Sequence, residues 1–329
     1  MKNVAIIGAG ISGLTLANLL KDHAQITIFE KARGVSGRMS TRRHEPYFFD
    51  HGAQYFTVRH QCFHDFLDPL MRNGIVKQWN PRYVKFDHNQ IIMRKNWADD
   101  EPRYVGAPGM NQIAKYLAKD VNVILNEEIV LLDKENTWQL KSKKGNLYHS
   151  FDWVISTAPA PQSASLLPKT FKYQDEISKI KMTPCLCLML GFSKSLSLEF
   201  EAAHVVNSNL SWLAVNSHKP DRKGLFSLVV HSSENYAQRA IREDDEKIIE
   251  ELCVETSRLI GQDVFAADFK SIHRWRYANI RKKDPKKLFI DHDLKIAACG
   301  DWCDQGRVEG AFISAWNLVK PLKEDILCD

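Results

Sequence analysis

Three glycines near the start of the chain, Gly8, Gly10 and Gly13, have the spacing of a turn that binds a dinucleotide. They lie between an apolar run at residues 3–7, typical of a strand buried on both faces, and a helical pattern that follows it. The first glycine permits a tight turn, the second lets a pyrophosphate approach the backbone, and the third lets helix and strand pack closely. Glu30 closes the next predicted strand and can accept hydrogen bonds from ribose hydroxyls. The pattern predicts a β-α-β unit that binds either NAD or FAD.

A second glycine motif follows the second predicted strand directly. It places Gly37, Arg38 and Met39 in succession, within a loop that begins at Lys31. Backbone amides and a guanidinium at this place can lie along the same pyrophosphate, as a second clamp that an NAD-binding domain normally lacks. This motif favours FAD over NAD.

The segment 49–56 comes soon after this clamp and combines small and polar residues. Gly52 and Ala53 would let the chain pass close to a flat ring, while Gln54 and Tyr55 offer polar atoms at the edge of that ring. We therefore expect this segment to contact a flavin. The alternative is an ordinary loop with a buried tyrosine.

A third motif lies near the carboxyl end of the chain, where a predicted strand at 294–299 runs into Gly300 and Asp301. Doubly wound sheets expose ligand groups at such strand ends, so the Asp301 carboxylate is expected to accept from a ribityl hydroxyl or to lie near the phosphate. Val308 and Gly310 then open the last predicted helix, whose amino-terminal dipole would stabilise negative charge on the pyrimidine side of a reduced flavin.

These motifs together give the predicted cofactor site. Cys299 and Cys303, at C-x3-C spacing, are expected to pack rather than to do thiol chemistry. The predicted cofactor-binding residues are Gly8, Gly10, Ile11, Ser12, Gly13, Glu30, Lys31, Gly37, Arg38, Met39, Gly52, Ala53, Gln54, Tyr55, Ile129, Gly300, Asp301, Arg307, Val308 and Gly310.

Composition sets the class of protein. A length of 329 residues with 44% hydrophobic content is enough for two structural units or one large composite. The net charge of +5 is spread without a long basic run, so neither nucleic acid nor a membrane surface is an expected partner. The seven cysteines include no C-x-x-C pair, which argues against a disulfide framework and a zinc site. We expect no metal and a cytosolic location.

The order of predicted elements indicates an interrupted α/β chain. Strands and helices alternate at the start, and mixed strands, among them a hairpin of strands at 121–132 and 136–141, fill the middle. A strand and a helix return at 294–299 and 309–320. We predict an α/β fold with a Rossmann-like FAD-binding domain, interrupted by an α+β substrate domain on a mixed or antiparallel sheet. The predicted FAD-binding domain takes in residues 1–76, 101–161 and 272–329, and the substrate domain takes in 77–100 and 162–271.

The motifs together resemble those of the renalase-type flavoproteins, in their bacterial branch. The resemblance spans nearly the whole chain and rests on Val4–Gly13 with Glu30, Gly37–Met39, Asp50–Phe56, Trp212–Pro220, Val230–Ser232, His273–Tyr277 and Gly300–Gly310. It implies a p-hydroxybenzoate hydroxylase-like fold and non-covalent FAD. It also implies an oxidase that takes hydride from the 2- or 6-dihydro isomers of NAD(P)H to flavin N5, and passes electrons to O2, giving H2O2 and NAD(P)+.

Two departures from this family concern the substrate. Relatives often read Asp-Leu-Gly where this chain has Asp50-His51-Gly52, and Ser-Lys-Pro-Gly where it has residues 218–221, His-Lys-Pro-Asp.

Four residues are the candidates for a substrate pocket. In the family's pattern a histidine at the position of His231 reaches the substrate, Asn216 can bond a carboxamide, and Trp275 or Tyr277 can stack on a ring. Plain structural roles remain the alternative for each. No general base is assigned, because loss of hydride from a dihydronicotinamide restores aromaticity and needs no proton removal.

Two other functions stay open. A flavin amine oxidase shares hydride transfer to N5 but acts on a small neutral amine, and the lysine that such oxidases hold against N5 has no evident position here. A non-catalytic flavin-binding redox module would lie outside enzymes altogether. The expected small-molecule partners are the dihydronicotinamide and O2.

Overall fold

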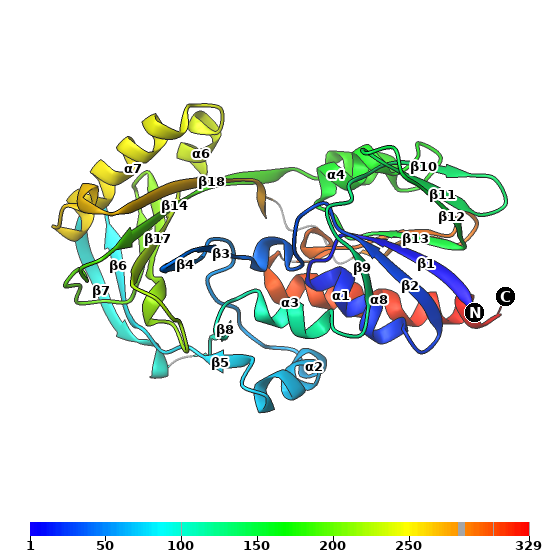
Figure 1. The fold of residues 1–329 in the computed structure, drawn as a ribbon, viewed down its shortest axis with the longest axis horizontal. Helices are drawn as coiled ribbons and strands as arrows, with labels where there is room; N and C mark the ends of the chain where they lie inside the picture. Colours follow the sequence, from blue (N-terminus) through cyan, green and yellow to red (C-terminus); the bar gives the residue numbers. More distant parts are fainter. Residues whose placement is uncertain (100, 282–286, 305, 329) are drawn as a thin grey trace. The chain divides into compact units, whose positions relative to one another are not determined.

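The structure is a computed structural model in which the chain forms two compact units (Figure 1). It describes residues 1–99, 101–281, 287–304 and 306–328. The first unit consists of Met1–Arg38, Ile113–Met182 and Asn279–Asp329, and the second of Met39–Gln112 and Thr183–Ala278. The chain thus crosses between units four times, as an interrupted domain requires.

The first unit is built on a six-stranded sheet. Its order is β19 (Phe289–Asp291), β20 (Ile296–Ala298), β13 (Trp153–Ser156), β1 (Lys2–Ile7), β2 (Ala24–Phe29) and β9 (Asn122–Ile124). All neighbours pair in parallel except β19 and β20. The central strands are apolar and buried, because layers cover both faces of a parallel sheet.

Helices and a small sheet supply those layers. Helices α1 (Ile11–Leu20) and α8 (Arg307–Cys328) lie side by side along one face of the sheet (Figure 1). An antiparallel sheet of β10 (Ile129–Lys134), β11 (Trp138–Ser142) and β12 (Leu147–Phe151) covers the other, where Tyr148 and Phe151 pack edge-on against Phe29. Helices α3 (Gln112–Leu117), α4 (Ala160–Leu166) and α5 (Gln174–Lys179) complete this part.

The second unit is built on a seven-stranded mixed sheet. Its order is β18 (Phe269–Ile280), β14 (Met182–Phe192), β17 (Phe226–Ser232), β16 (Leu210–Val215), β15 (Ala202–Val206), β6 (Arg82–Asp87) and β7 (Gln90–Asn96). Strands β15 and β6 pair in parallel, while β14, β17, β16 and β15 pair antiparallel in turn.

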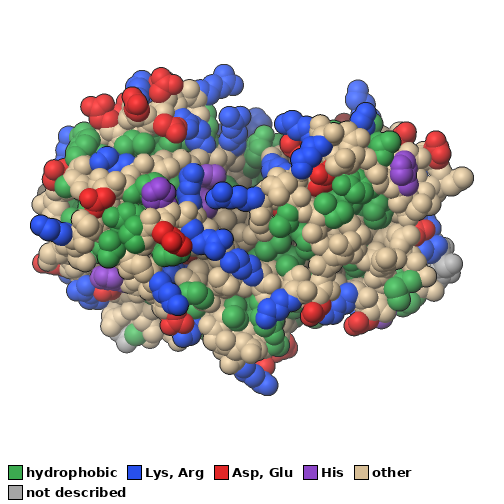
Figure 2. All heavy atoms as spheres, in the orientation of Figure 1, with side chains coloured by type: hydrophobic (Ala, Val, Ile, Leu, Met, Phe, Trp, Pro, Cys, Tyr) green, Lys and Arg blue, Asp and Glu red, His purple; other side chains and the backbone are tan. Residues whose placement is uncertain are grey.

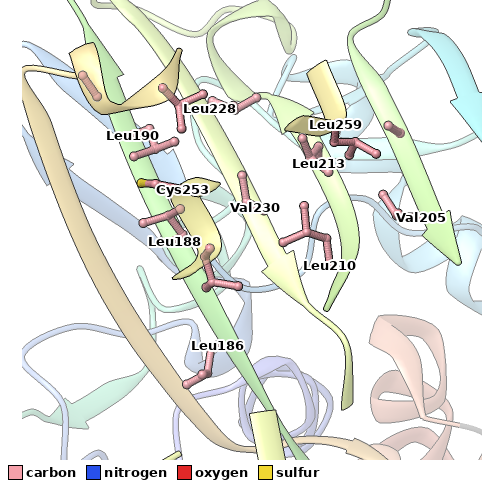
Figure 3. Close-up of a cluster of buried hydrophobic side chains, with 14 of the residues drawn as sticks. Leu186, Leu188, Leu190, Val205, Leu210, Leu213, Leu228, Val230, Cys253 and Leu259 are labelled. Atoms are coloured by element: carbon pink, nitrogen blue, oxygen red, sulfur yellow. The ribbon is translucent and has the colours of Figure 1, made fainter. Parts of the chain in front are cut away.

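The two faces of this sheet are covered by different elements. Leu186, Leu188 and Leu190 alternate along β14 and point into a core that α6 (Glu234–Ala240) and α7 (Asp245–Ile260) close (Figure 3). The hairpin of β3 (Thr41–His44) and β4 (Tyr47–Asp50) packs on the opposite face. A Cβ on Gly191 would lie 2.5 Å from the ring of Tyr47, so the small residue lets β4 approach β14 closely. Helix α2 (Gln61–Arg72), β5 (Val76–Gln78) and β8 (Tyr104–Gly106) complete the unit.

The predicted fold class is confirmed, with local differences. The run 121–132 is wrong as one strand, because Asn126 adopts a left-handed φ of 56° and separates β9 from β10. The last helix begins two residues earlier than predicted and extends to Cys328. The compact units divide at 38/39, 112/113, 182/183 and 278/279. Residues 39–76, 101–112 and 272–278 therefore pack with the second unit, and residues 162–182 pack with the first. Where cofactor and substrate divide between the units stays a prediction.

The surface carries charged side chains of both signs. Basic side chains lie beside acidic and apolar ones over both units on the face that Figure 2 shows. Among the helices of the described residues, none has the length and apolar character needed to cross a membrane.

Candidate functional site

Two glycines of the first motif are required by packing alone. Gly8 has a φ of +110°, which L side chains rarely adopt, and a Cβ there would lie 2.8 Å from Thr157 Oγ1. A Cβ on Gly13 would lie 2.1 Å from the carbonyl oxygen of Gly8. The strand and helix therefore approach as closely as the motif predicts.

Gly10 is different, because it faces open space. A Cβ added there meets no atom within 4 Å, and Gly10 caps α1 without a side-chain hydrogen bond to the free N–H groups of the first turn. A Cβ on Gly37 would lie 3.4 Å from Gly10 Cα, so the second motif lies against the first. Open space before a helix amino terminus fits a pyrophosphate. The residues present therefore fit a dinucleotide cofactor.

Glu30 has a role in the turn itself. Its carboxylate oxygens accept from the backbone N–H groups of Ala9 and Ala32, both at 2.8 Å. A carboxylate has about four acceptor sites, so a ribose hydroxyl can still bond. The segment before Ile129 joins this loop, since Glu127 N–H donates to the Glu30 carbonyl at 2.9 Å.

Arg38 and Asp301, 263 residues apart, are brought together. The guanidinium donates to both carboxylate oxygens, at 2.9 and 2.5 Å, and the aspartate side chain is only 6% exposed. The pair links the second motif to the carboxyl-terminal motif, as expected of elements that share one ligand. Whether each group also touches phosphate or ribityl oxygens stays a prediction.

The carboxyl-terminal motif is held by Gly300. A Cβ there would lie 2.5 Å from the Trp302 indole, whose N–H donates to Ala158. Ser314 of α8 accepts from the Gly300 N–H at 3.1 Å, which ties the strand end to this helix. Cys299 is buried, and burial raises its pKa to about 12, in agreement with packing rather than thiol chemistry.

The remaining cofactor candidates of the first unit have simple positions. Ser12 Oγ donates to the Ala311 carbonyl of α8 at 2.8 Å. Ile11 and Ile129 are buried and Lys31 is exposed. Residues Arg307, Val308 and Gly310 form the first turn of α8, and Met39, at the start of the second unit, is buried.

In the second unit the predicted flavin segment begins at a buried ionic network around Asp50. One carboxylate oxygen accepts from Thr41 Oγ1 at 2.7 Å and from Met110 N–H at 3.0 Å. The other accepts from Arg222 at 2.5 and 3.1 Å, and from Lys219 Nζ at 3.5 Å. All three charged side chains are 0% exposed.

The pKa values follow from this geometry. Burial alone would raise the pKa of Asp50, but the charges of Lys219 and Arg222 and the hydrogen bonds from Met110 and Thr41 lower it to about 2. Burial lowers the pKa of Lys219 to about 8, with Asp50 opposing this effect and Arg222 adding to it. Sequence reasoning missed Lys219 and Arg222 as site residues, because nothing in the sequence brings them to Asp50.

Gln54 connects this network to the pocket candidates. Its oxygen accepts from Lys219 Nζ at 3.1 Å, and its nitrogen donates to the carbonyls of Asp50 and Gly52 at 2.5 and 3.0 Å. The turn 50–54 is thus closed by its own glutamine.

His231 and Trp275 converge on one acceptor, the carbonyl of His51. The indole N–H of Trp275 lies 2.8 Å from this oxygen and Nε2 of His231 lies 3.3 Å from it. The Trp275 ring also stacks on His51, with centroids 5.2 Å apart, and contacts His273 edge-on. Two of the four pocket candidates therefore share a partner in the predicted flavin segment.

These imidazoles are neutral near pH 7. Burial, then the repulsion between the protonated forms of His51 and His273, lowers the pKa of His51 to about 3. Burial lowers the pKa of His231 to about 4, and burial with the charge of Arg42 lowers that of His273 to about 4.

The other candidates are less open to a ligand. Asn216 is 0% exposed, and its amide accepts from Asp50 N–H and donates to the Phe48 carbonyl. Tyr277 lies partly exposed on β18. Tyr55 belongs to an aromatic cluster with Trp97 and Trp212, at ring distances of 4.9 and 5.5 Å. Gly52 and Ala53 are partly exposed.

Comparisons with known proteins agree with this arrangement. Residues 6–70 match the model of the NAD(P)-binding Rossmann-like domain, and residues 83–319 match that of the flavin containing amine oxidoreductases. An L-amino-acid oxidase of Siganus canaliculatus is 37% identical over 90 residues, which are 26% of this chain and 16% of that protein.

Solved structures share the fold along the whole chain. A candidate protoporphyrinogen oxidase from Exiguobacterium sp. 255-15 superposes with a TM-score of 0.79 at 12% identity, covering 98% of this chain and 99% of that one. A putrescine oxidase redesigned in its cofactor binding superposes with a TM-score of 0.72 at 13% identity, covering 99% of each chain.

Fold, glycine turns and matches define a flavin-dependent oxidoreductase with FAD as its cofactor. The chain belongs to the flavin containing amine oxidoreductase family.

Substitutions at Gly10 and Gly13 should have different effects, the first on FAD binding and the second on stability. Gly10→Ala adds a methyl group to open space at an ordinary φ of −79°, so the apoprotein should unfold within about 2 °C of wild type, while FAD affinity falls at least about tenfold. Gly13→Ala forces a Cβ onto a carbonyl and should cost at least about 2 kcal/mol of stability. Thermal unfolding measures the stability of each variant, and titration with FAD measures its affinity for the cofactor. Wild-type FAD affinity in Gly10→Ala would contradict the prediction that the pyrophosphate lies at Gly10.

The buried carboxylate predicts a specific acid sensitivity. Because the pKa of Asp50 falls from 3.8 to about 2 on folding, its stabilisation is present above about pH 4 and is lost as the pH drops toward 2. Asp50→Asn leaves Lys219 and Arg222 without a counter-charge and should cost about 3–5 kcal/mol at pH 7. Asp68→Asn, which breaks the exposed pair with Arg72, should change stability by less than about 1 kcal/mol. Denaturant unfolding at several pH values would reject this account if both variants behaved alike.

Proposed function

We propose that the protein oxidises 2- or 6-dihydro isomers of NAD(P)H. The observation that carries this proposal is the pair of side chains bound to the His51 carbonyl, the neutral imidazole of His231 and the indole of Trp275. Such groups orient a polar ring by hydrogen bonding and stacking but take no proton at neutral pH. A dihydronicotinamide needs only that, because hydride loss makes its ring aromatic.

In this proposal some residues bind the cofactor and others bind the substrate. In the first unit, residues around Gly10 and Gly37, with the Arg38–Asp301 pair, would hold the dinucleotide. His231 bonds the carboxamide of the substrate, and Trp275 supports the ring position. FAD bound there would supply the hydride acceptor, and O2 would be the final oxidant, reduced to H2O2. The resemblance to renalase-type flavoproteins supports the same substrate class.

Oxidation of a small amine is the second candidate. The family match favours it, and so does Lys219, a buried lysine at 3.1 Å from Gln54 with a pKa lowered to about 8. Its substrate must lose a proton before hydride transfer, since amines are charged at neutral pH.

Anaerobic mixing of the purified holoprotein with candidate substrates tests the proposal. We expect 6-dihydro-NAD or 2-dihydro-NAD to bleach the flavin absorbance within seconds, and putrescine and other amines to leave it unchanged on that timescale. The reverse pattern would establish an amine oxidase instead. If no reductant bleaches the flavin, the protein is a flavin-binding redox module.

The pH dependence separates the same alternatives. Because the pKa values of His51, His231 and His273 lie at about 3 to 4, the rate of flavin reduction by a dihydronicotinamide isomer should change less than about twofold between about pH 5.5 and 7. A rate that instead climbs about tenfold per pH unit would indicate that a proton must leave the substrate first.

A further inference from the structure

We infer that Lys219 is a positioning residue that fixes the orientation of Gln54. Gln54 in turn holds the turn 50–54, so that the His51 carbonyl points at Nε2 of His231 and Nδ1 of this histidine remains a hydrogen-bond acceptor. The positioning itself follows from the contacts of the second unit. Its consequence for the substrate rests on the proposed function.

First, Lys219 lies closer to the amide of Gln54 than to the carboxylate of Asp50. Arg222 already gives the Asp50 carboxylate two hydrogen bonds, at 2.5 and 3.1 Å, whereas Lys219 Nζ is 3.5 Å from it. The shorter contact of the ammonium, 3.1 Å, is with the neutral oxygen of Gln54. The Trp79 ring faces the same ammonium at 5.2 Å. A buried cation is therefore directed at an amide.

The second step is the orientation of that amide. An ammonium only donates, so the oxygen of Gln54 must face Lys219 and the nitrogen must face away. The two hydrogens of the nitrogen are then used by the carbonyls of Asp50 and Gly52. Gln54 thus ties the turn on both sides of His51.

The third step fixes the tautomer of His231. Its Nε2 lies 3.3 Å from the His51 carbonyl, which only accepts, so this nitrogen carries the hydrogen. Gln54 Nε2, at 3.4 Å, has no hydrogen left to give. With a pKa of about 4 the ring is neutral at pH 7, and Nδ1 keeps its lone pair. That lone pair accepts an N–H, such as one from a carboxamide.

The fourth step is the role of Trp275 as a second donor to the same carbonyl. Its N–H reaches the His51 oxygen at 2.8 Å, so the direction of this oxygen sets both side chains. Without the ammonium, the Gln54 oxygen would be buried with no strong donor, and the amide would turn to find one. The turn 50–54 would then adopt more than one conformation, and the His51 carbonyl would no longer fix one tautomer of His231.

Selective ¹⁵N-histidine NMR of the holoprotein, with the His231 signals assigned from His231→Gln, tests this inference without substrate. Wild type should show a protonated Nε2 and a bare Nδ1, with one tautomer exceeding the other by at least about tenfold. Lys219→Met should mix the tautomers, while Lys247→Met, the same change at an exposed helix position, should not. Gln54→Glu keeps an oxygen for Lys219 but loses both donors to the turn, and should also mix the tautomers.

A kinetic readout connects the effect to the substrate. Lys219→Met should raise the KM for the oxidised dihydronicotinamide isomer about tenfold, with kcat changed less than about threefold, because one substrate contact is lost. Unchanged His231 signals in folded Lys219→Met or Gln54→Glu would overturn the inference, whatever the activity. Mixed tautomers in a protein that oxidises no isomer would instead support the positioning role and reject the proposed function.

Discussion

The buried carboxylate of Asp50 is the interaction on which the candidate site of the second unit depends. It receives hydrogen bonds from Thr41, from Met110 and from the pair Lys219 and Arg222, which come from three separate segments of the chain. Buried charges of this kind persist only when every acceptor site is filled. Because β4 ends at Asp50, the same bonds determine where the turn 50–54 begins, and so where His51 and Gln54 lie.

The first unit relies on a different constraint, the absence of side chains. Gly8, Gly13 and Gly300 are each required by an atom that a Cβ would meet, whereas Gly10 leaves space that no protein atom fills. Packing thus explains three of these glycines, and the open space at Gly10 fits the predicted dinucleotide. The Arg38–Asp301 pair then joins motifs from the two ends of the chain.

The local parts of the site could be predicted from the sequence. The glycine spacing, the strand and helix around it, and the strand end at Gly300 depend on residues close in the chain, and the structure has them as expected. The run 121–132 was predicted as one strand, but the left-handed Asn126 divides it. A single residue with positive φ leaves the apolar pattern around it unchanged, so the pattern could not predict this break.

The long-range parts could not be predicted in the same way. Lys219 and Arg222 are 169 and 172 residues from Asp50, and their role exists only once β3, β4 and the turn after β16 are packed together. Glu30 was expected to face ribose, yet its first contacts are with its own loop, because a carboxylate satisfies whichever donors are nearest.

The proposed function requires that the second unit orients a ring that loses hydride and needs no base. The most direct measurement is the rate of anaerobic flavin reduction by 6-dihydro-NAD carrying deuterium at the reacting carbon, compared in H2O and D2O. The account predicts slower reduction with the deuterated substrate and the same rate in both solvents. A rate that falls in D2O, or no reduction by this compound, would contradict it.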